Sequence, residues 1–167
     1  MGHSPYRQWQ VFRKSRLIIV VSAADAPAVV MARQLASLLA THLPESRAMM
    51  SRAPDPSSVA KLLGSQQLDV ALLSSAEAHE LHRGAGPFAD DGAVALRALA
   101  AVGDHLVVCR HDFAPARARE IGQAIADHWT GSEPLRTPRA DTGSVSAVSI
   151  PWHPAVVEYY ESRASMR

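Results

Sequence analysis

The sequence predicts an α/β fold, in which a three-layer, parallel-rich sheet carries helices on both faces. Short apolar runs rich in β-branched residues alternate with longer segments whose apolar residues recur at helical spacing. The 167 residues are 47% hydrophobic and contain no low-complexity tract, which is typical of one compact core. We therefore expect a single domain over residues 17–167, preceded by an N-terminal arm over residues 1–16.

The first half of the chain predicts three strands and three helices. Residues 17–21 form a continuous apolar run, as expected of a strand buried on both faces. Asp25 precedes a helical pattern that Pro44 ends, and a second strand follows at residues 47–52. Asp55 is the expected N-cap of the next helix. The third strand covers residues 68–73, and the pair Ser74-Ser75 opens a short helix through residue 81. These strands should lie in the order second, first, third at the centre of the sheet.

The second half predicts a hairpin and two further helices. Residues 84–92 are rich in turn-forming residues, and the Gly103-Asp104 pair separates apolar runs at residues 95–102 and 105–110. Residues 114–129 form an alanine-rich helix. A long polar loop over residues 130–143, an edge strand over residues 145–150 and a closing helix over residues 154–162 follow.

Composition excludes several classes of function. The 17 Lys and Arg residues are balanced by 16 Asp and Glu residues, so the basic surface of a nucleic-acid-binding protein is not expected. The single Cys cannot form a disulfide within the chain. The longest apolar run, residues 17–21, is too short to span a bilayer.

The N-terminal arm has two interpretations. Residues 1–4 have the composition of a remnant of an expression tag. Behind them, Tyr6, Trp9 and Phe12 interleave with basic residues, which is typical of a segment beside a membrane and predicts an anchor upstream. Alternatively, Trp9 and Phe12 pack on the body of the domain.

The histidines and the cysteine suggest no cofactor, metal site or catalytic residue. His79 and His82 lie three apart with Glu80 between them, which is not the spacing of the two-histidine zinc helix, and a solvated helix face is the simpler interpretation. Cys109 and His111 lie on one side of a strand, where a buried structural thiol is the simpler interpretation. We expect a protein that is not an enzyme.

Three pieces of the sequence carry a resemblance to a known family. They are Gln-Leu-Asp-Val-Ala-Leu-Leu-Ser at residues 67–74, the apolar runs at residues 96–100 and 105–108, and His153-Pro154 followed by Tyr159-Tyr160. Their succession resembles the first lobe of the periplasmic solute receptors of the TAXI branch of TRAP transporters, over residues 17–113 and 152–161. The resemblance implies one lobe of the type II periplasmic-binding-protein-like fold, a role in transport of a small organic solute, and a periplasmic, membrane-anchored location. The four basic residues of the arm favour the cytoplasmic side instead.

The sequence also departs from that family. The Gly-rich stretch expected after the first strand is replaced by residues 22–27, which contain no Gly, and the expected Gly-Ser turn after the second strand is replaced by residues 53–58. About 40 residues separate Phe113 from His153, which is too few for a second lobe.

The candidate binding residues follow the predicted strands. In open α/β sheets, ligands bind outside the carboxyl ends of the strands, where helix N-termini present free N–H groups. The residues expected there are Ser22, Asp25, Arg52, Asp55, Ser57, Ser58, Ser74 and Ser75. Arg52 is the candidate cation and the serines are candidate donors for an anionic group. Alternatively, the aspartates and serines are ordinary helix caps.

Two classes of function follow. The first is a non-catalytic solute-binding or sensing module. The alternative is a protein-interaction accessory subunit that has lost ligand binding, with the crevice closed by Pro27, Pro54 and Pro56. An open polar crevice favours the first, and a crevice filled by side chains favours the second. Because the inner face of a lone lobe needs cover, we also expect either a homodimer through the strand-end face or the arm folded across that face.

Overall fold

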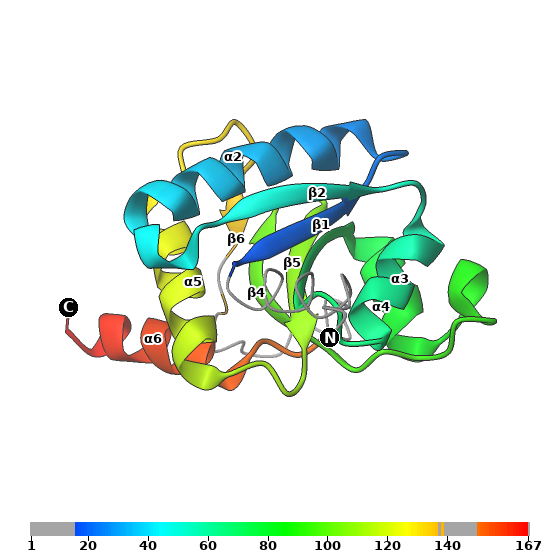
Figure 1. Cartoon of the computed structure of the whole chain (residues 1–167). Coiled ribbons are helices and arrows are strands. Elements are labelled where there is room, and N and C mark those ends of the chain that lie inside the picture. Colours follow the sequence, from blue (N-terminus) through cyan, green and yellow to red (C-terminus); the bar gives the residue numbers. More distant parts are fainter. Residues whose placement is uncertain (1–15, 137, 139–149, 167) are drawn as a thin grey trace, which may run out of the picture.

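The computed structural model describes residues 16–136, 138 and 150–166. It contains one six-stranded sheet in the order β2-β1-β3-β5-β4-β6, with helices on both sides (Figure 1). The strands are β1 (Ile18–Ser22), β2 (Met49–Ala53), β3 (Val70–Ser74), β4 (Leu96–Val102), β5 (His105–Arg110) and β6 (Leu135–Arg136). The helices are α2 (Ala26–His42), α3 (Pro56–Gly64), α4 (Ser75–Arg83), α5 (Pro115–His128) and α6 (Pro154–Ser165), with short 3₁₀ turns η1 (Pro44–Ser46) and η2 (Gly86–Phe88).

The strand pairing confirms the predicted neighbours of β1 but makes the sheet mixed. β1 lies between β2 and β3 and is parallel to both. β5 is antiparallel to β3 and β4, and β6 is antiparallel to β4. The tight turn after β4 is the physical reason, because it forces β5 to run back along β4. The β2-β1-β3 group therefore forms one end of the sheet, and not its centre, with β2 at the edge.

Two apolar cores cover the two faces of the sheet, which confirms the three-layer architecture. Alternate residues of β1 point to opposite faces, as the period of a strand requires. Ile19 and Val21 belong to the core that includes residues of α2, α5 and α6, whereas Ile18 and Val20 belong to the core that includes residues of α3 and α4. Figure 1 shows α2 along one side of the sheet and α3 with α4 near its other side.

The predicted helix caps are present. The carboxylate of Asp25 accepts from the N–H of Ala28 at 3.1 Å, and that of Asp55 accepts from the N–H of Ser58 at 2.7 Å. Gly84 ends α4 in the left-handed conformation, at φ +65°, where a Cβ would lie 2.8 Å from the backbone N of Ala93. Local chemistry therefore fixes where these helices begin and end.

The C-terminal segment closes one end of the molecule. His153 caps α6 by accepting from the N–H of Ala155, and its Nε2 lies 3.0 Å from the carbonyl oxygen of Phe113. The predicted edge strand lies outside the described residues except for Ile150, which is buried. Of the predicted long loop, Leu135–Arg136 pair with β4 as β6, and residues 137 and 139–143 lie outside the described residues.

The predicted N-terminal arm also lies outside the described residues, apart from Arg16. In the part of the chain that the structure describes, no helix combines the length and the apolar character needed to cross a membrane.

Candidate strand-end site

The carboxyl ends of β1 and β3 meet at a point where the chain leaves the sheet toward opposite faces. After β1 the chain enters α2, whose buried residues belong to one core, and after β3 it enters α4, whose Ala78 and Leu81 belong to the other. In open α/β sheets such a switch point is where ligands bind. Ser22 and Asp25 from the first connection and Ser74 from the second occupy it.

Asp25 and His105 form a partly buried polar pair at this switch point. Asp25 Oδ2 lies 2.8 Å from Nε2 of His105, and the two side chains are 19% and 11% exposed. His105 is the first residue of β5, and the strand register places it opposite Ser74. The Asp25 carboxylate therefore has two partners, since its other oxygen caps α2.

His105 is a site residue that the sequence analysis missed. It lies 80 positions from Asp25 in the sequence, and only the pairing of β5 with β3 brings the two residues together. The turn at Gly103-Asp104 indicated where β5 begins, but no local signal indicated which strand it would join. A histidine directly after a predicted turn was the available hint.

The serines at this point are engaged with backbone groups. Ser22 is only 1% exposed, and its Oγ accepts from the N–H of Ala24 at 3.2 Å. Ser74 Oγ accepts from the N–H of Glu77 and caps α4. The N–H and the hydroxyl of Ser75 both donate to the carbonyl oxygen of Asp104, at 2.7 and 2.9 Å. Among the described residues, none of these hydroxyls is hydrogen-bonded to His105, so the cluster is not arranged as a nucleophile with its base.

The other four predicted residues lie on β2 and the first turn of α3. Asp55 is exposed, and the hydrogen bond from the backbone of Ser58 lowers the pKa of its carboxyl group. Ser57 donates its hydroxyl to Asp91 Oδ2 at 2.8 Å. Arg52 is exposed on the edge strand. The eight predicted residues therefore form two groups, and only Ser22, Asp25, Ser74 and Ser75 surround the switch point.

Glu77 carries a buried side-chain oxygen without a partner among the described residues, in the first turn of α4. Its backbone N–H donates to Ser74 Oγ at 3.2 Å. Its Oε2 is the one buried side-chain oxygen or nitrogen in the described part of the chain that has no hydrogen-bond partner. A carboxylate oxygen in this state is costly unless something pairs with it.

One cavity lies away from the strand-end cluster. It has a volume of about 440 Å³ and is lined by Arg33, Ser37 and Trp129 together with the stacked rings of His42 and His128.

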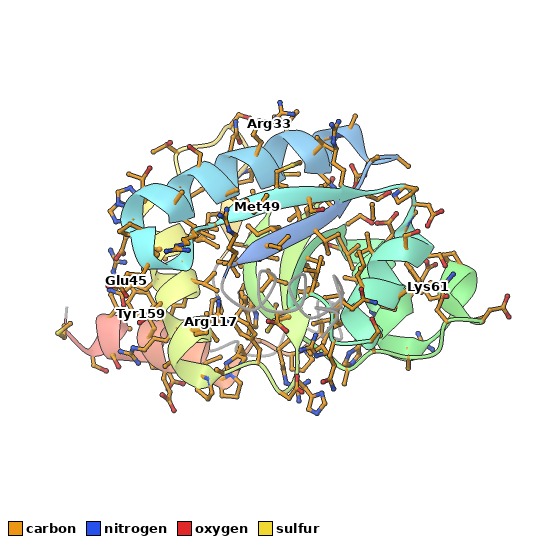
Figure 2. The ribbon with its side chains drawn as sticks, in the orientation of Figure 1. Arg33, Glu45, Met49, Lys61, Arg117 and Tyr159 are labelled. Carbon is orange, nitrogen blue, oxygen red and sulfur yellow. The ribbon has the colours of Figure 1, made fainter. Side chains whose placement is uncertain are left out.

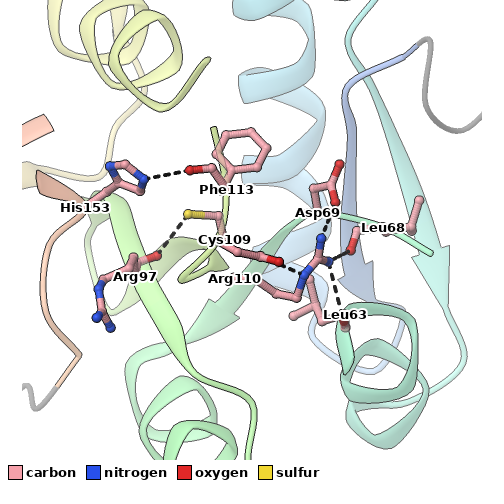
Figure 3. A network of polar contacts seen from close by, with 9 residues as sticks. Leu63, Leu68, Asp69, Arg97, Cys109, Arg110, Phe113 and His153 are labelled. Atoms are coloured by element: carbon pink, nitrogen blue, oxygen red, sulfur yellow. Dashed lines mark hydrogen bonds and ion pairs between the residues drawn. The ribbon is translucent and has the colours of Figure 1, made fainter. Parts of the chain in front are cut away.

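The histidine and cysteine groups take structural positions. His82 Nδ1 accepts from the N–H of Leu96 at 3.0 Å, and desolvation lowers its pKa, so the predicted solvated face is wrong for this residue. Cys109 is buried and donates to the carbonyl oxygen of Arg97 (Figure 3), and burial raises the pKa of its thiol to about 12. Within residues 16–136, 138 and 150–166, no cluster of three His, Cys, Asp or Glu residues is placed to hold a metal ion.

Comparison of the sequence with protein-family models and with curated proteins finds no match.

Proposed function

We propose that the protein is a non-catalytic solute-binding or sensing module, similar to one lobe of a TAXI-type solute receptor. The observation that carries this proposal is the polar cluster of Ser22, Asp25, Ser74 and His105 at the switch point between β1 and β3. A buried polar pair contributes little net stability, so its presence at the usual ligand-binding edge favours a role in recognition.

The charges of the cluster indicate what kind of solute fits. The carboxylate of Asp25 is an acceptor that is 19% exposed beside His105. A small organic solute with an ammonium group would give this carboxylate a cationic donor. An amino acid also carries a carboxylate. The imidazole of His105 is a candidate donor for this carboxylate once the solute replaces the bond between His105 and Asp25.

Thermal unfolding with a panel of amino acids, small amines and small carboxylates tests the proposal. A solute that binds only the native state raises the melting temperature. Asp25→Asn keeps an N-capping side chain while removing the charge, so we expect it to abolish the rise. Asp55→Asn is the matched control, because it makes the same change at the cap of α3 and should leave the rise intact. A rise that persists in Asp25→Asn would place the solute elsewhere.

Arg52→Ala tests whether Arg52 binds an anionic group of the solute. Arg52 lies on the edge strand and not in the cluster around His105. If an anionic group of the solute binds there, this variant should also lose the rise, with little change in the melting temperature of the free protein.

A second candidate function is supported by the closed geometry of the cluster. Ser22 is fully buried and the serine hydroxyls are already paired, which favours an interaction subunit that no longer admits a solute. No change in melting temperature across the whole panel would support this candidate. The resemblance further supports a periplasmic, membrane-anchored location for either function, which a fusion to a reporter active only in the periplasm would test.

A further inference from the structure

The cavity between α2 and the segment that follows α5 is lined by basic and hydroxyl groups. Arg33, Ser37 and Thr41 are spaced four residues apart on α2 and therefore share one face of the helix. His42, the last residue of α2, stacks on His128, the last residue of α5, with ring centroids 3.5 Å apart and an angle of 3° between the ring planes. Among the described residues, no Asp or Glu lines this cavity. An anion would therefore meet no competing carboxylate there.

The basic groups of this cavity have no polar partner within the described part of the chain. Arg33 is exposed on α2 (Figure 2), and its guanidinium makes no hydrogen bond or ion pair with a described residue. The ring nitrogens of His42 and His128 likewise make no hydrogen bond with a described residue. In contrast, Arg110 and Arg163 donate to acceptors of the fold itself. The cavity therefore brings together donors that the described fold does not use.

The indole ring of Trp129 forms a wall of the cavity that its own loop holds in place. Its Nε1–H donates to the carbonyl oxygen of Glu133 at 2.8 Å, which closes residues 129–133 into a short loop. Gly131 lies directly against the ring, because a Cβ added there would lie only 2.1 Å from a ring carbon. Leu38 on α2 supplies further apolar surface to the same cavity. An organic ligand would therefore find an apolar contact beside the basic groups.

The parallel stacking of the two imidazoles argues against a metal ion as the occupant. The lone pairs of imidazole nitrogens lie in the ring plane. A metal ion bound in the plane of His42 therefore cannot also lie in the plane of His128, which is stacked parallel to it. Imidazole N–H groups can instead donate to the oxygens of an anion.

We propose that this cavity binds a small organic anion, a carboxylate or a phosphate ester, with its acid group on Arg33 and its apolar part against Leu38 and Trp129. A guanidinium can donate two parallel hydrogen bonds to such an acid group. The histidine pair and the hydroxyl of Ser37 supply further donors. The volume of about 440 Å³ lies within the range of about 300–1,000 Å³ that small-molecule sites occupy. This site is separate from the strand-end cluster and does not rest on the function proposed above.

Proton NMR of the histidine rings tests binding directly. Phenyl phosphate and benzoate are the organic probes, inorganic phosphate tests the acid group alone, and benzylamine tests the opposite charge, all at constant pH. We expect both organic anions to shift the ring signals of His42 and His128, which His42→Gln and His128→Gln identify. Inorganic phosphate should bind more weakly, because it leaves the apolar wall uncovered, and benzylamine should cause no shift. The tighter of the two organic anions distinguishes a phosphate-ester site from a carboxylate site. No shift with either organic anion, or equal shifts with benzylamine, would overturn the proposal.

Substitution of Arg33 tests the acid-group contact in the same titration. Arg33→Gln should weaken binding of the organic anions by about tenfold or more, because it removes a charged donor, and Arg33→Lys should keep part of the affinity. Lys61→Gln is the matched control, since it removes the same charge from an exposed position of α3, which packs on the opposite face of the sheet. Asp25→Asn should bind these anions as the parent protein does, which separates this site from the strand-end cluster. Equal weakening in Arg33→Gln and Lys61→Gln would indicate attraction to overall charge and would contradict a site at Arg33.

Gly131→Ala tests the indole wall. The added Cβ has to displace the indole or the loop, so phenyl phosphate should bind more weakly while inorganic phosphate binds as before. Ser132→Ala is the control, because it changes the next residue of the same loop. The melting temperature of each unliganded variant shows that the fold is intact. If Gly131→Ala leaves the affinity for phenyl phosphate unchanged, the ligand does not lie on the indole and its assigned placement is wrong.

Discussion

Arg110 forms the densest polar network in the described structure, and its removal should destabilise the fold. Its guanidinium donates to the carbonyl oxygens of Leu63 at 3.2 Å and Leu68 at 2.7 Å, and to Asp69 at 2.6 Å and Asp112 at 3.2 Å (Figure 3). One side chain at the end of β5 thus ties the end of α3 to the start of β3. The informative substitution is Arg110→Met, which keeps an apolar stem and removes every donor.

The expected magnitude follows from the burial of each partner. The Arg110 side chain is 13% exposed, and a hydrogen bond from a charged donor contributes about 1.5–3 kcal/mol. The Leu63 oxygen has a second donor in the N–H of Gln66, so its loss is the smaller one. We expect Arg110→Met to cost about 3 kcal/mol in unfolding free energy, which lowers the melting temperature by roughly 6–12 °C. Asp69 is 40% exposed, so Asp69→Asn should cost less than about 1 kcal/mol.

Urea unfolding of the variants provides the measurement. Arg97→Met is the matched control, because Arg97 makes one such bond, to the carbonyl oxygen of Leu96 at 3.0 Å, and should cost about 1 kcal/mol. The order of cost is therefore Arg110→Met, then Arg97→Met, with Asp69→Asn at or below it. If Asp69→Asn costs as much as Arg110→Met, the carbonyl contacts are not the stabilising part of the network and the reasoning is wrong.

Three further predictions concern packing, the thiol and the site. Gly122→Ala should lower the free energy of unfolding by about 1–3 kcal/mol, although alanine has the better helix propensity. The reason is that the added Cβ would lie 2.8 Å from a methyl group of Val156. Adding Val156→Ala should recover part of the lost melting temperature. Cys109 should resist iodoacetamide in the folded protein at pH 8, because its thiol is buried. Burial raises the pKa of this thiol from 9.0 to about 12. The free energy of unfolding should therefore be unaffected by this group below pH 9 and should fall as the pH rises from 9 toward 12. The double variant Asp25→Ser with His105→Leu should have a melting temperature no lower than that of the parent protein, but solutes should no longer raise it. A decrease of several kcal/mol in the free energy of unfolding would instead show that the pair stabilises the fold.

The elements that sequence predicted are those set by local chemistry. Asp25, Asp55 and Ser74 satisfy backbone N–H groups three residues ahead, and this signal is complete within a few residues of each helix start. The apolar run at residues 17–21 likewise required burial on both sides, which placed it inside the sheet. The predicted strand began and ended one residue before β1, Ile18–Ser22.

The features that sequence did not predict depend on contacts between distant segments. The hairpin of β4 and β5 was expected, but its insertion beside β3 was not, because a turn specifies only which two strands it joins. The partners of Asp25 and Arg110 both depend on that insertion. The two-residue strand β6 is too short to carry a periodic signal.

The strand β5 separates two kinds of polar chemistry at opposite ends of β3. Because the two strands are antiparallel, Arg110 lies near the amino end of β3 and His105 lies opposite Ser74 at its carboxyl end. At the amino end, the Arg110 side chain donates to the carbonyl oxygens of Leu63 and Leu68 and to Asp69. The polar groups there therefore stabilise the fold. At the carboxyl end, Asp25 and His105 form a partly buried polar pair. Stability does not require that arrangement, since an apolar cluster would cost less to bury. The carboxyl end is therefore where a solute or a partner protein should make its contacts.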